Sequence, residues 1–544
     1  MTTYSHLNSS AATLTKNRTE DSISPFSGMC TTCVDGCIGM CEIGKSAYRG
    51  AEMIYPQPFG IITAASQKDY PVDLSHFTIL GRCAGAWGIE EDSDKALFPK
   101  VDLEVKFGKE PGIHCKLPIE IAAMGSTNVA KNNWAGLAAG AALSGIPLWI
   151  GENVAGMDME SRFEQGRLIS CPELEFRVNS YREWQQEGYG EVILQANVED
   201  TKLGVQEWAM KKLGIKAVEL KWGQGAKDIG GEVKIRDLNK AQELQRRGYV
   251  VLPDPSDPNV IEAFKRGSFH EFERHSRVGM VTEDAFLKRV EDLRKSGAKW
   301  ITLKTGAYRP LDLARAVKYA SLAELDLLTV DAAGGGTGMS PWRMMNEWGI
   351  PGIELWSLLR EYCDKLAAKR AYIPPLALAG GFTFEDQMFK GFALGAPYVR
   401  MIGMARSPLA AAMVAKTIGK AIEEQSLPIY IQRFGMTVDE IFVTAPELRH
   451  KLGDRFAKLP VGAIGVYTYF ARLAQGLRQL MAGARKFALP YIDRTDIAAL
   501  TLDAARISGV PYVMDVDKVE VDQMLTVNGH RPKPRGPVVV ARKK

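Results

Sequence analysis

Eight short apolar runs dominate the middle of the sequence, and each ends in small or polar residues. Amphipathic stretches with helical spacing follow most of these runs. Apolar runs that alternate with helices are typical of a parallel sheet buried on both faces. Eight such units within residues 117–425 predict an α/β fold of the (β/α)₈ TIM-barrel type, with an open doubly wound sheet as the alternative. The expected strands are Leu117–Met124, Pro147–Ile150, Val192–Val198, Ala217–Trp222, Trp300–Lys304, Leu327–Val330, Leu376–Ala379 and Tyr398–Ile402.

The barrel accounts for only part of the 544 residues, and the chain before the barrel differs in composition from the chain after it. Within the barrel, residues 225–285 suggest an elaborated loop over the C-terminal face, with a further strand at Gly248–Asp254 and a turn at Asp254–Asn259. The sequence thus predicts five regions: a disordered polar tail (1–25), a Cys-rich segment (26–60), a lead-in region (61–116), the barrel (117–425) and a C-terminal helical extension (426–544).

The overall charge and hydropathy exclude several classes of protein. The formal net charge is only +4, which gives no reason to expect nucleic acid as a partner. No segment reaches 18 uninterrupted apolar residues, so no membrane span is expected. The N-terminus is polar and lacks the apolar stretch of a secretory signal, which favours a cytoplasmic protein.

Four of the eight cysteines lie within twelve residues, in the pattern C-x2-C-x3-C-x3-C. The surrounding segment has too few apolar residues to form a core, so a bound metal would have to order it. Four thiolates this close can hold a [4Fe–4S] cluster or a tetrahedral zinc ion, and the absence of a metal is the third interpretation. The candidate ligands are Cys30, Cys33, Cys37 and Cys41.

Two motifs resemble well-known sites without meeting their requirements. Gly39–Ser46 (GMCEIGKS) matches the P-loop pattern, but cysteines precede it where a P-loop has a hydrophobic strand, so we interpret Lys45 as structural. The histidines His270 and His275 (HEFERH) are five residues apart rather than four and do not share a helix face, which argues against a zinc-protease site.

Glycines follow each of the last three predicted strands. Asp331–Pro341 (DAAGGGTGMSP) contains three consecutive glycines, which let the backbone approach a ligand closely and direct N–H groups at an anion. Gly380–Gly381 and Gly403 follow the seventh and eighth runs. Because these loops commonly bind phosphate in such barrels, we expect a phosphate site here.

Three other strand ends carry residues suited to a flat, anionic ligand. Ala122–Ser126 (AAMGS) ends the first run, and its small residues allow a planar ring to lie against the strand end. Lys221–Lys227 (KWGQGAK) ends the fourth run and suits a dicarboxylate or a flavin carbonyl. Lys304, at the end of the fifth run, could oppose negative charge on a flavin.

Together these motifs resemble the FMN-binding synthase domain of glutamate synthase, over residues 115–425. The resemblance rests on five motifs in the same order: the small-residue turn at the first strand, a Gly–Glu turn at Gly151–Glu152, the lysine–glutamine loop, Lys304, and the glycine loops. It implies a barrel that binds FMN and takes an anionic 2-oxo acid or amino acid above the flavin.

The resemblance also implies roles for individual residues. Catalytic and substrate-holding roles fall to Lys304, Lys221, Gln224 and Lys227. FMN contacts fall to Ala122, Ala123, Met124, Ser126, Glu152, Gln195, Lys304, Asp331, Gly334, Gly335, Gly336, Thr337, Gly380, Gly381 and Gly403. A flavin in the same chain favours a [4Fe–4S] cluster over zinc at the four cysteines. The cluster would receive electrons from ferredoxin or from a partner subunit, and the chain is expected to form a homo-oligomer or a complex.

The sequence departs from the family in two places. The family carries its cluster cysteines just after the eighth strand, whereas Arg400–Leu409 has none, so the cluster is expected to have moved to the N-terminus. No glutaminase domain with an N-terminal nucleophilic cysteine is expected, and no dinucleotide fingerprint follows a strand, which argues against NAD(P)H.

The reaction expected first is the reductive amination of 2-oxoglutarate to glutamate. The alternatives are an oxidoreductase for an N-substituted amino acid or a hydroxy acid, a flavin and iron–sulfur electron-transfer subunit, and a non-redox barrel with a structural zinc.

Overall fold

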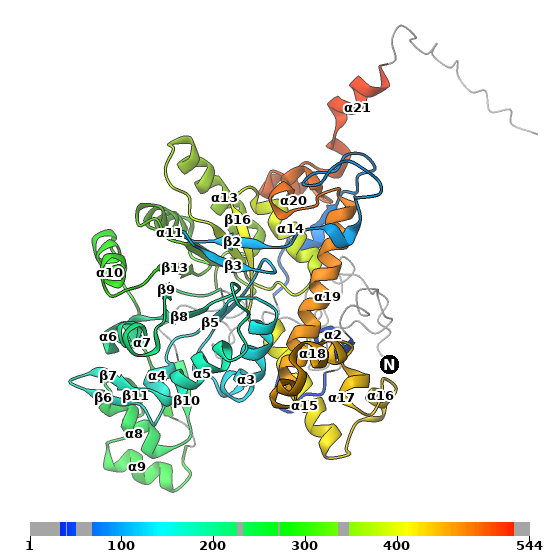
Figure 1. The fold of residues 1–544 in the computed structure, drawn as a ribbon. Coiled ribbons are helices and arrows are strands. Elements are labelled where there is room, and N and C mark those ends of the chain that lie inside the picture. The colour runs from blue at the N-terminus through cyan, green and yellow to red at the C-terminus, as the bar shows by residue number, and fades with distance from the viewer. Residues whose placement is uncertain are drawn as a thin grey trace, which may run out of the picture.

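The computed structural model describes residues 33–39, 41–49, 68–225, 232–269, 272–335 and 348–526. Its centre is a closed barrel of eight parallel strands in the order β13-β14-β15-β16-β4-β5-β8-β9 (Figure 1). All eight expected strands are present, so the barrel is confirmed and the open sheet is wrong. The strands are β4 (Ile119–Met124), β5 (Leu148–Ile150), β8 (Val192–Ala196), β9 (Ala217–Lys221), β13 (Trp300–Thr305), β14 (Leu327–Asp331), β15 (Leu376–Ala379) and β16 (Val399–Met404).

Helices follow each barrel strand and cover the outside of the barrel. The local sequence explains where they begin and end: in α10, Thr282 caps the first turn by accepting from Ala285 N, and Arg294 and Lys295 lie in the last turn. The covering helices are α3 (Asn128–Leu143), α4 (Val154–Met157), α5 (Pro172–Arg182), α6 (Val198–Leu203), α7 (Val205–Leu213), α10 (Glu283–Lys295), α11 (Pro310–Leu322), α13 (Gly352–Ala368), α14 (Glu385–Gly395) and α15 (Arg406–Glu423).

The lead-in region closes the N-terminal end of the barrel. Its hairpin, β2 (Val105–Phe107) and β3 (Ile113–Cys115), places Phe107 and Ile113 against the bottom layer of barrel side chains. Lys109 O accepts from the indole of Trp300 at 2.9 Å, which ties the hairpin to β13. The interior is therefore a filled core at this end, and ligands in such barrels bind at the opposite, C-terminal end of the strands.

Two excursions interrupt the barrel units. The larger contains α8 (Leu238–Arg246), α9 (Pro258–Lys265) and an antiparallel sheet in the order β10-β12-β11, made of β10 (Glu232–Ile235), β11 (Val250–Leu252) and β12 (Phe272–His275). The predicted strand at Gly248–Asp254 corresponds to β11. This excursion has its own small apolar core. The smaller excursion is a hairpin of β6 (Arg162–Glu164) and β7 (Arg167–Ser170).

The chain after the barrel is mostly helical and packs against it. The long helix α19 contacts α3 and α15 closely, because Gly136 and Gly462 bring their backbones together. A short strand, β17 (Ile497–Ala499), pairs with β1 (Phe77–Ile79). The helices are α16 (Ile429–Gln432), α17 (Val438–Ile441), α18 (Ala445–Leu452), α19 (Val461–Gly483), α20 (Leu502–Ser508) and α21 (Lys518–Leu525).

The N-terminal cysteine segment lies beside α15 and α19 (Figure 1). Helix α2 (Glu42–Arg49) begins before the Gly-Lys-Ser triplet, and Lys45 and Ser46 are buried. A Cβ on Gly44 would lie only 2.5 Å from Gly39 Cα, so no phosphate fits between the two glycines. The P-loop interpretation is therefore excluded, as the sequence context predicted.

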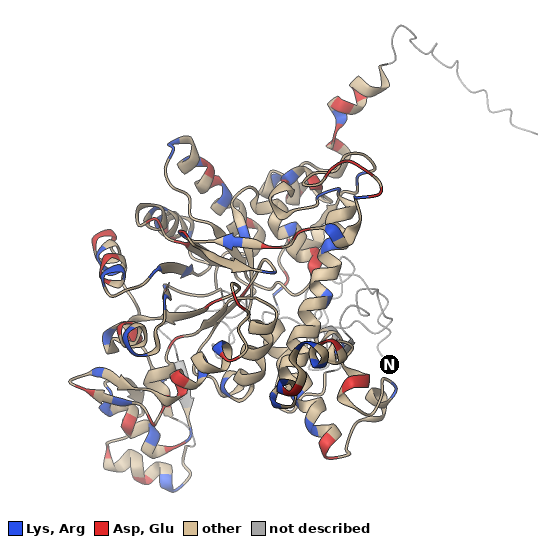
Figure 2. Ribbon diagram, viewed as in Figure 1, with Lys and Arg blue, Asp and Glu red and all other residues tan. Residues whose placement is uncertain are grey.

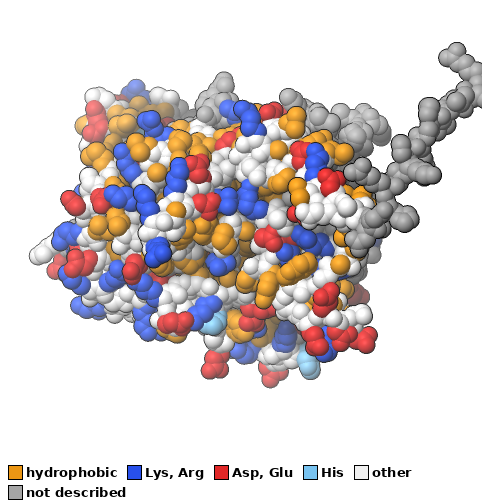
Figure 3. All heavy atoms as spheres, turned by 90° about the horizontal axis from the view of Figure 1, so that it is seen from above, with side chains coloured by type: hydrophobic (Ala, Val, Ile, Leu, Met, Phe, Trp, Pro, Cys, Tyr) orange, Lys and Arg blue, Asp and Glu red, His pale blue; other side chains and the backbone are white. Residues whose placement is uncertain are grey.

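Both signs of charge are distributed over most of the helices (Figure 2). On the face seen in Figure 3, basic and acidic side chains are interspersed rather than segregated. Among the described residues, no helix has the length and apolar character needed to cross a bilayer.

Candidate active site at the open end of the barrel

A buried ion pair lies at the open end of the barrel interior. Lys304 Nζ on β13 lies 3.1 Å from Asp331 Oδ2 on β14, and both side chains are less than a tenth exposed. The parallel register places Lys304 beside Lys221 of β9 on one side and Thr329 of β14 on the other.

Two further carboxylates lie below this pair inside the barrel. Gln195 Nε2 and Thr302 Oγ1 donate to the two oxygens of Glu219, at 2.6 and 2.9 Å. Thr329 Oγ1 donates to Glu120 Oε2 at 3.0 Å. The interior therefore changes from apolar at the bottom to strongly polar near the open end.

Burial and mutual repulsion shift the titration of this cluster. Burial, then the charge of Glu219, raises the pKa of Glu120 to about 8, although Lys304 opposes the shift. Burial also raises the pKa of Glu219, against the lowering effect of Lys304. Burial lowers the pKa of Lys304, but Asp331 and the two glutamates outweigh it and raise that pKa above its ordinary value. At neutral pH the cluster thus holds a charged lysine and a protonated Glu120.

Buried acceptors without partners occur in the same region. Gln195 Oε1 and Thr305 Oγ1 are buried and have no hydrogen-bond partner within the described part of the chain. Buried polar atoms in native proteins are nearly always satisfied by protein groups, by water or by a bound group. The side chain of Gln195 is therefore half satisfied by Glu219 and half available to a ligand.

Glu152, Lys221 and Gln224 meet at the neighbouring rim. Lys221 Nζ pairs with Glu152 Oε1 and donates to Gln224 Oε1 at 3.0 Å. The next residue, Asn153, has a left-handed backbone (φ 65°), and its N–H donates to Asp200 Oδ2 at 2.9 Å. Burial raises the pKa of Asp200 to about 7. The hydrogen bond from Asn153 to Asp200 fixes the position of the Gly151–Glu152 turn and so of the Glu152 carboxylate.

The glycine loops after β14 and β15 pack directly on each other. A Cβ on Gly335 would lie 2.5 Å from Asp331 Oδ1, and one on Gly380 would lie 2.9 Å from Ala332 N. Gly334 and Gly381 have positive φ of 99° and 115°, but no atom lies within 3.5 Å of where their side chains would be. Two glycines therefore permit close loop packing, whereas at the other two an added Cβ would make only ordinary van der Waals contacts with described atoms, the ring of Tyr70 among them.

Gly403 has a different reason to be glycine. It lies within β16 beside Ala379 and Glu120, and a Cβ there would lie 2.8 Å from Glu120 Oε1. Its small size makes room for the buried glutamate. Contact with a phosphate at this position stays a prediction.

The small-residue turn after β4 is held by a buried arginine that sequence reasoning missed. Arg177 Nη1 donates to Met124 O at 3.2 Å and to Gly125 O at 2.9 Å, while its guanidinium stacks on Trp134. Gly125 and Gly151 allow the ends of β4 and β5 to approach closely. This arrangement places Ala122 and Ala123 with Met124 at the open end, whereas Ser126 lies in the bend beyond it.

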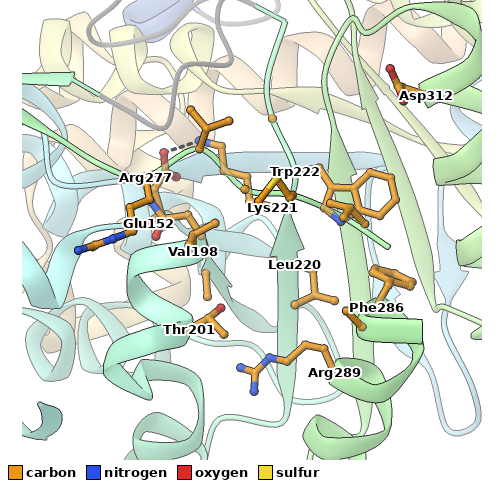
Figure 4. Close-up of a pocket in the computed structure, with 18 of the residues that line it drawn as sticks. Glu152, Val198, Thr201, Leu220, Lys221, Trp222, Arg277, Phe286, Arg289 and Asp312 are labelled. Atoms are coloured by element: carbon orange, nitrogen blue, oxygen red, sulfur yellow. Dashed lines mark hydrogen bonds and ion pairs between the residues drawn. The ribbon is translucent and has the colours of Figure 1, made fainter. Parts of the chain in front are cut away.

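A cavity of about 490 Å³ adjoins the lysine–glutamine loop (Figure 4). Glu152, Lys221 and Gln224 form its polar end. Its remaining walls come from the ends of β8 and β9, from α6, α10 and α11, and from the loops before α10 and α11.

The cysteine segment lies near the end of β16. Gly39 N donates to Cys37 Sγ at 3.3 Å, and Cys41 is buried against the main core. Burial raises the pKa of Cys33, while Arg406, the first residue of α15, lowers it. The described residues include no group of three or more side chains placed to hold a metal ion. Cys30 lies outside the described residues.

Several predicted residues lie outside the described residues as well: Lys227, Gly336, Thr337 and His270. The structure brings together Lys304, Asp331, Gln195 and the rim trio. It adds Glu120, Glu219 and Arg177, which were not expected. A single acidic residue inside an apolar run, as in Pro118–Ile121 and Ala217–Leu220, was the available signal for the two glutamates.

One family model matches part of the chain. Residues 275–415 match the family model described as the conserved region in glutamate synthase. A search of curated protein sequences found no match.

Solved structures with a similar chain path include two of flavocytochrome b2 and one of mandelate oxidase. A flavocytochrome b2 variant with pyruvate bound has 13% identity and a TM-score of 0.45, covering 85% of this chain and 84% of that one. The recombinant flavin-binding domain of baker's yeast flavocytochrome b2 has 14% identity and a TM-score of 0.44, covering 86% and 84%. A mandelate oxidase variant with 2-hydroxy-phenylacetamide has 13% identity and a TM-score of 0.41, covering 82% and 91%.

Proposed function

We propose that this protein is an FMN-dependent oxidoreductase acting on 2-oxo acids and the corresponding amino or hydroxy acids, because residues 275–415 match the family model described as the conserved region in glutamate synthase. The observation that carries the proposal is the convergence of Lys304, the orphaned Gln195 Oε1 and the open glycine cradle at one end of the barrel. Each of these features suits a different part of a flavin mononucleotide.

The residues at this end fit FMN part by part. The backbone of Gly334 and Gly381 would face the phosphate, because an added Cβ at either glycine would come no closer than 3.6 Å to any described atom. The end of β4, with Ala122 and Ala123, would lie against the ring. Gln195 Oε1 would accept from a ring N–H, because it is buried and has no partner in the described part of the chain.

When bound, FMN would supply hydride transfer to or from the carbon next to a substrate carboxylate. Lys304 would favour negative charge beside it, since its ammonium is buried and its pKa is raised. Lys221 and Gln224 would hold the substrate carboxylate. For this, Lys221 must exchange its pairing with Glu152 for the substrate, so Glu152 would move or take up a proton.

The reaction we put first is the reductive amination of 2-oxoglutarate with ammonia to give glutamate, a CH–NH₂ oxidoreductase reaction. Reaction with an N-substituted amino acid or a hydroxy acid uses the same carboxylate site. The resemblance of the lysine–glutamine loop to the synthase domain supports the first reaction.

Electrons would enter through a [4Fe–4S] cluster at Cys30, Cys33, Cys37 and Cys41, from ferredoxin or a partner subunit. The support is positional: Cys33 lies beside Arg406, directly after β16, where the glutamate synthase family carries its cluster cysteines. In the folded protein, the cysteine segment would thus lie where the family's cluster cysteines lie, although it is far from that position in the sequence. The N–H of Gly39 that donates to Cys37 Sγ is a contact typical of cluster-bound sulfur.

The test is anaerobic purification followed by absorption spectroscopy, iron and sulfide analysis, and reoxidation of the dithionite-reduced protein. Flavin bands with four irons per chain, and reoxidation that needs both 2-oxoglutarate and ammonium, are the expected results. A colourless protein would contradict the proposal. Flavin that no oxo acid reoxidises, in a protein that copurifies with a partner, would instead favour an electron-transfer subunit.

A further inference from the structure

We propose that the cavity beside Lys221 binds the side chain of the substrate, and that the preferred substrates are 2-oxo acids or amino acids with a large apolar side chain. This inference rests on the proposed function, because it assigns the substrate carboxylate to Lys221 and Gln224. It goes further in naming the substrate class that this chain would favour over 2-oxoglutarate.

Lys221 is shared between the barrel interior and the cavity. On β9, Glu219 and Lys221 are on the face that lines the interior, where Glu219 binds Gln195 and Thr302. Leu220 and Trp222 are on the opposite face and line the cavity. A carboxylate held by Lys221 therefore places the rest of the molecule at the mouth of the cavity (Figure 4).

The walls beyond Lys221 are mostly apolar. Trp222 and Phe286 meet edge to face with ring centroids 5.3 Å apart. Trp222 N donates to Lys304 O at 2.9 Å, and Tyr308 Oη donates to Trp222 O at 2.8 Å, so the wall is fixed to β13. The apolar lining residues are Ala196, Val198, Leu220, Trp222, Val278, Met280, Val281, Ala285 and Phe286.

The lip of the cavity exposes apolar side chains to solvent. Met280 is 95% exposed, Val278 is 60% exposed and Val281 is 39% exposed, all in the loop that leads into α10. Exposed apolar clusters beside a cavity are typical of ligand-binding surfaces. A bound apolar side chain would cover part of this surface.

The basic residues of the cavity already engage acids. Arg277 binds both oxygens of Glu199, Arg289 binds Glu207, and Arg315 binds Asp312. A second substrate carboxylate would have to compete with these carboxylates, so a dicarboxylate gains little here beyond a hydrogen bond to Arg289 Nε, which is buried and has no partner in the described part of the chain. The volume of about 490 Å³ also exceeds what the side chain of 2-oxoglutarate fills.

The test is isothermal titration calorimetry of the purified full-length protein with two probes, 3-phenyl-2-oxopropanoate and 2-oxoglutarate. We expect the aromatic acid to bind about tenfold more tightly or better, as the burial of a phenyl ring implies. Val198→Trp should fill the cavity and reduce that preference about tenfold. Val198 is 38% exposed at the start of α6, so the larger side chain should not disturb the core.

Val250→Trp is the matched control, because Val250 is 51% exposed on the inserted sheet and does not line the cavity. It should keep the wild-type preference. Tighter binding of 2-oxoglutarate, or a preference that Val198→Trp leaves unchanged, would overturn the inference while the proposed function stands. If neither acid binds to the flavin-loaded protein, the proposed function fails together with it.

Discussion

At the scale of single residues, the unusual feature is two glutamates enclosed in a barrel with one lysine. Glu120 and Glu219 are each at most 2% exposed, and their hydrogen bonds to Thr329, Thr302 and Gln195 replace water only in part. Burying like charges together costs stability unless one of them takes a proton. The protein therefore keeps a proton inside the barrel, one layer below the position proposed for the flavin.

Glu120→Gln should remove a pH dependence of stability. Native Glu120 keeps its proton up to about pH 8, whereas the unfolded chain releases it near the ordinary value of 4.5. The native state therefore binds more protons between these values, and the free energy of unfolding falls as pH rises through that window. The loss is on the order of 4 kcal/mol, and Glu120→Gln should abolish most of it.

Urea unfolding at about pH 5.5 and about pH 8.5 measures this difference. Glu324→Gln provides the control, because Glu324 forms a surface ion pair with Lys109 and should leave the pH slope as it is in the wild type. An unchanged slope in Glu120→Gln would show that Glu120 is not the group that holds the proton.

At the scale of elements, the loops after β14 and β15 form the rim of the proposed phosphate site. Their glycines are of two kinds. Gly335 and Gly380 allow the loops to touch, whereas an added Cβ on Gly334 or Gly381, both at positive φ, would come no closer than 3.6 Å to any described atom. Only the second kind can be tested without breaking the packing of the loops.

Gly381→Ala should weaken FMN binding more than its effect on stability explains. The Cβ would project into the space assigned to the phosphate, so we expect about a tenfold loss of affinity. Strain at φ 115° adds a stability loss of about 1 kcal/mol. FMN content after purification and thermal unfolding would measure the two effects separately.

Gly297→Ala is the matched control. Gly297 has a similar φ of 109°, also has open space around it, and lies in the turn between α10 and β13 at the other end of the barrel. It should show the same stability loss with full FMN content. Equal FMN content in the two variants would place the phosphate elsewhere.

At the scale of the whole molecule, the C-terminal helices and the cysteine segment are packed on one side of the barrel. Helix α19 lies between α3, α14, α15 and α2, and one continuous apolar core includes all of them. The end of β16, the cysteines and the extension are therefore parts of one packed unit. A change within α19 should affect the stability of the barrel rather than that of a separate domain.

Gly462→Ala should destabilise the protein, because the added Cβ would lie 2.9 Å from Ala412 O and 3.3 Å from Gly136 Cα. Overpacking of this kind costs about 1–3 kcal/mol. Gly483→Ala, in the last turn of the same helix with nothing within 4 Å, should instead gain up to about 1 kcal/mol. Denaturant unfolding should give one transition in both variants, and a separate transition for α19 would contradict a single packed unit.

The sequence by itself determined the barrel and the glycine rim. Buried parallel strands require continuous apolar runs, and loops that touch backbone to backbone require glycine. A short stretch of sequence is therefore enough to recognise each feature. The lysine at the end of β13 and the lysine–glutamine loop could be found in the same way. The two glutamates were visible as single acidic residues in apolar runs. The sequence around each of them did not reveal that both side chains lie together in the barrel interior.

The tertiary structure alone decided which side chains meet. Glu120 and Glu219 are 99 positions apart in the sequence, and only closure of the barrel brings both of them close to Lys304. The same holds for Arg177 under the turn after β4, for Cys33 beside Arg406, and for the cavity between β9 and α10. These contacts depend on barrel closure and helix packing, which local periodicity does not encode.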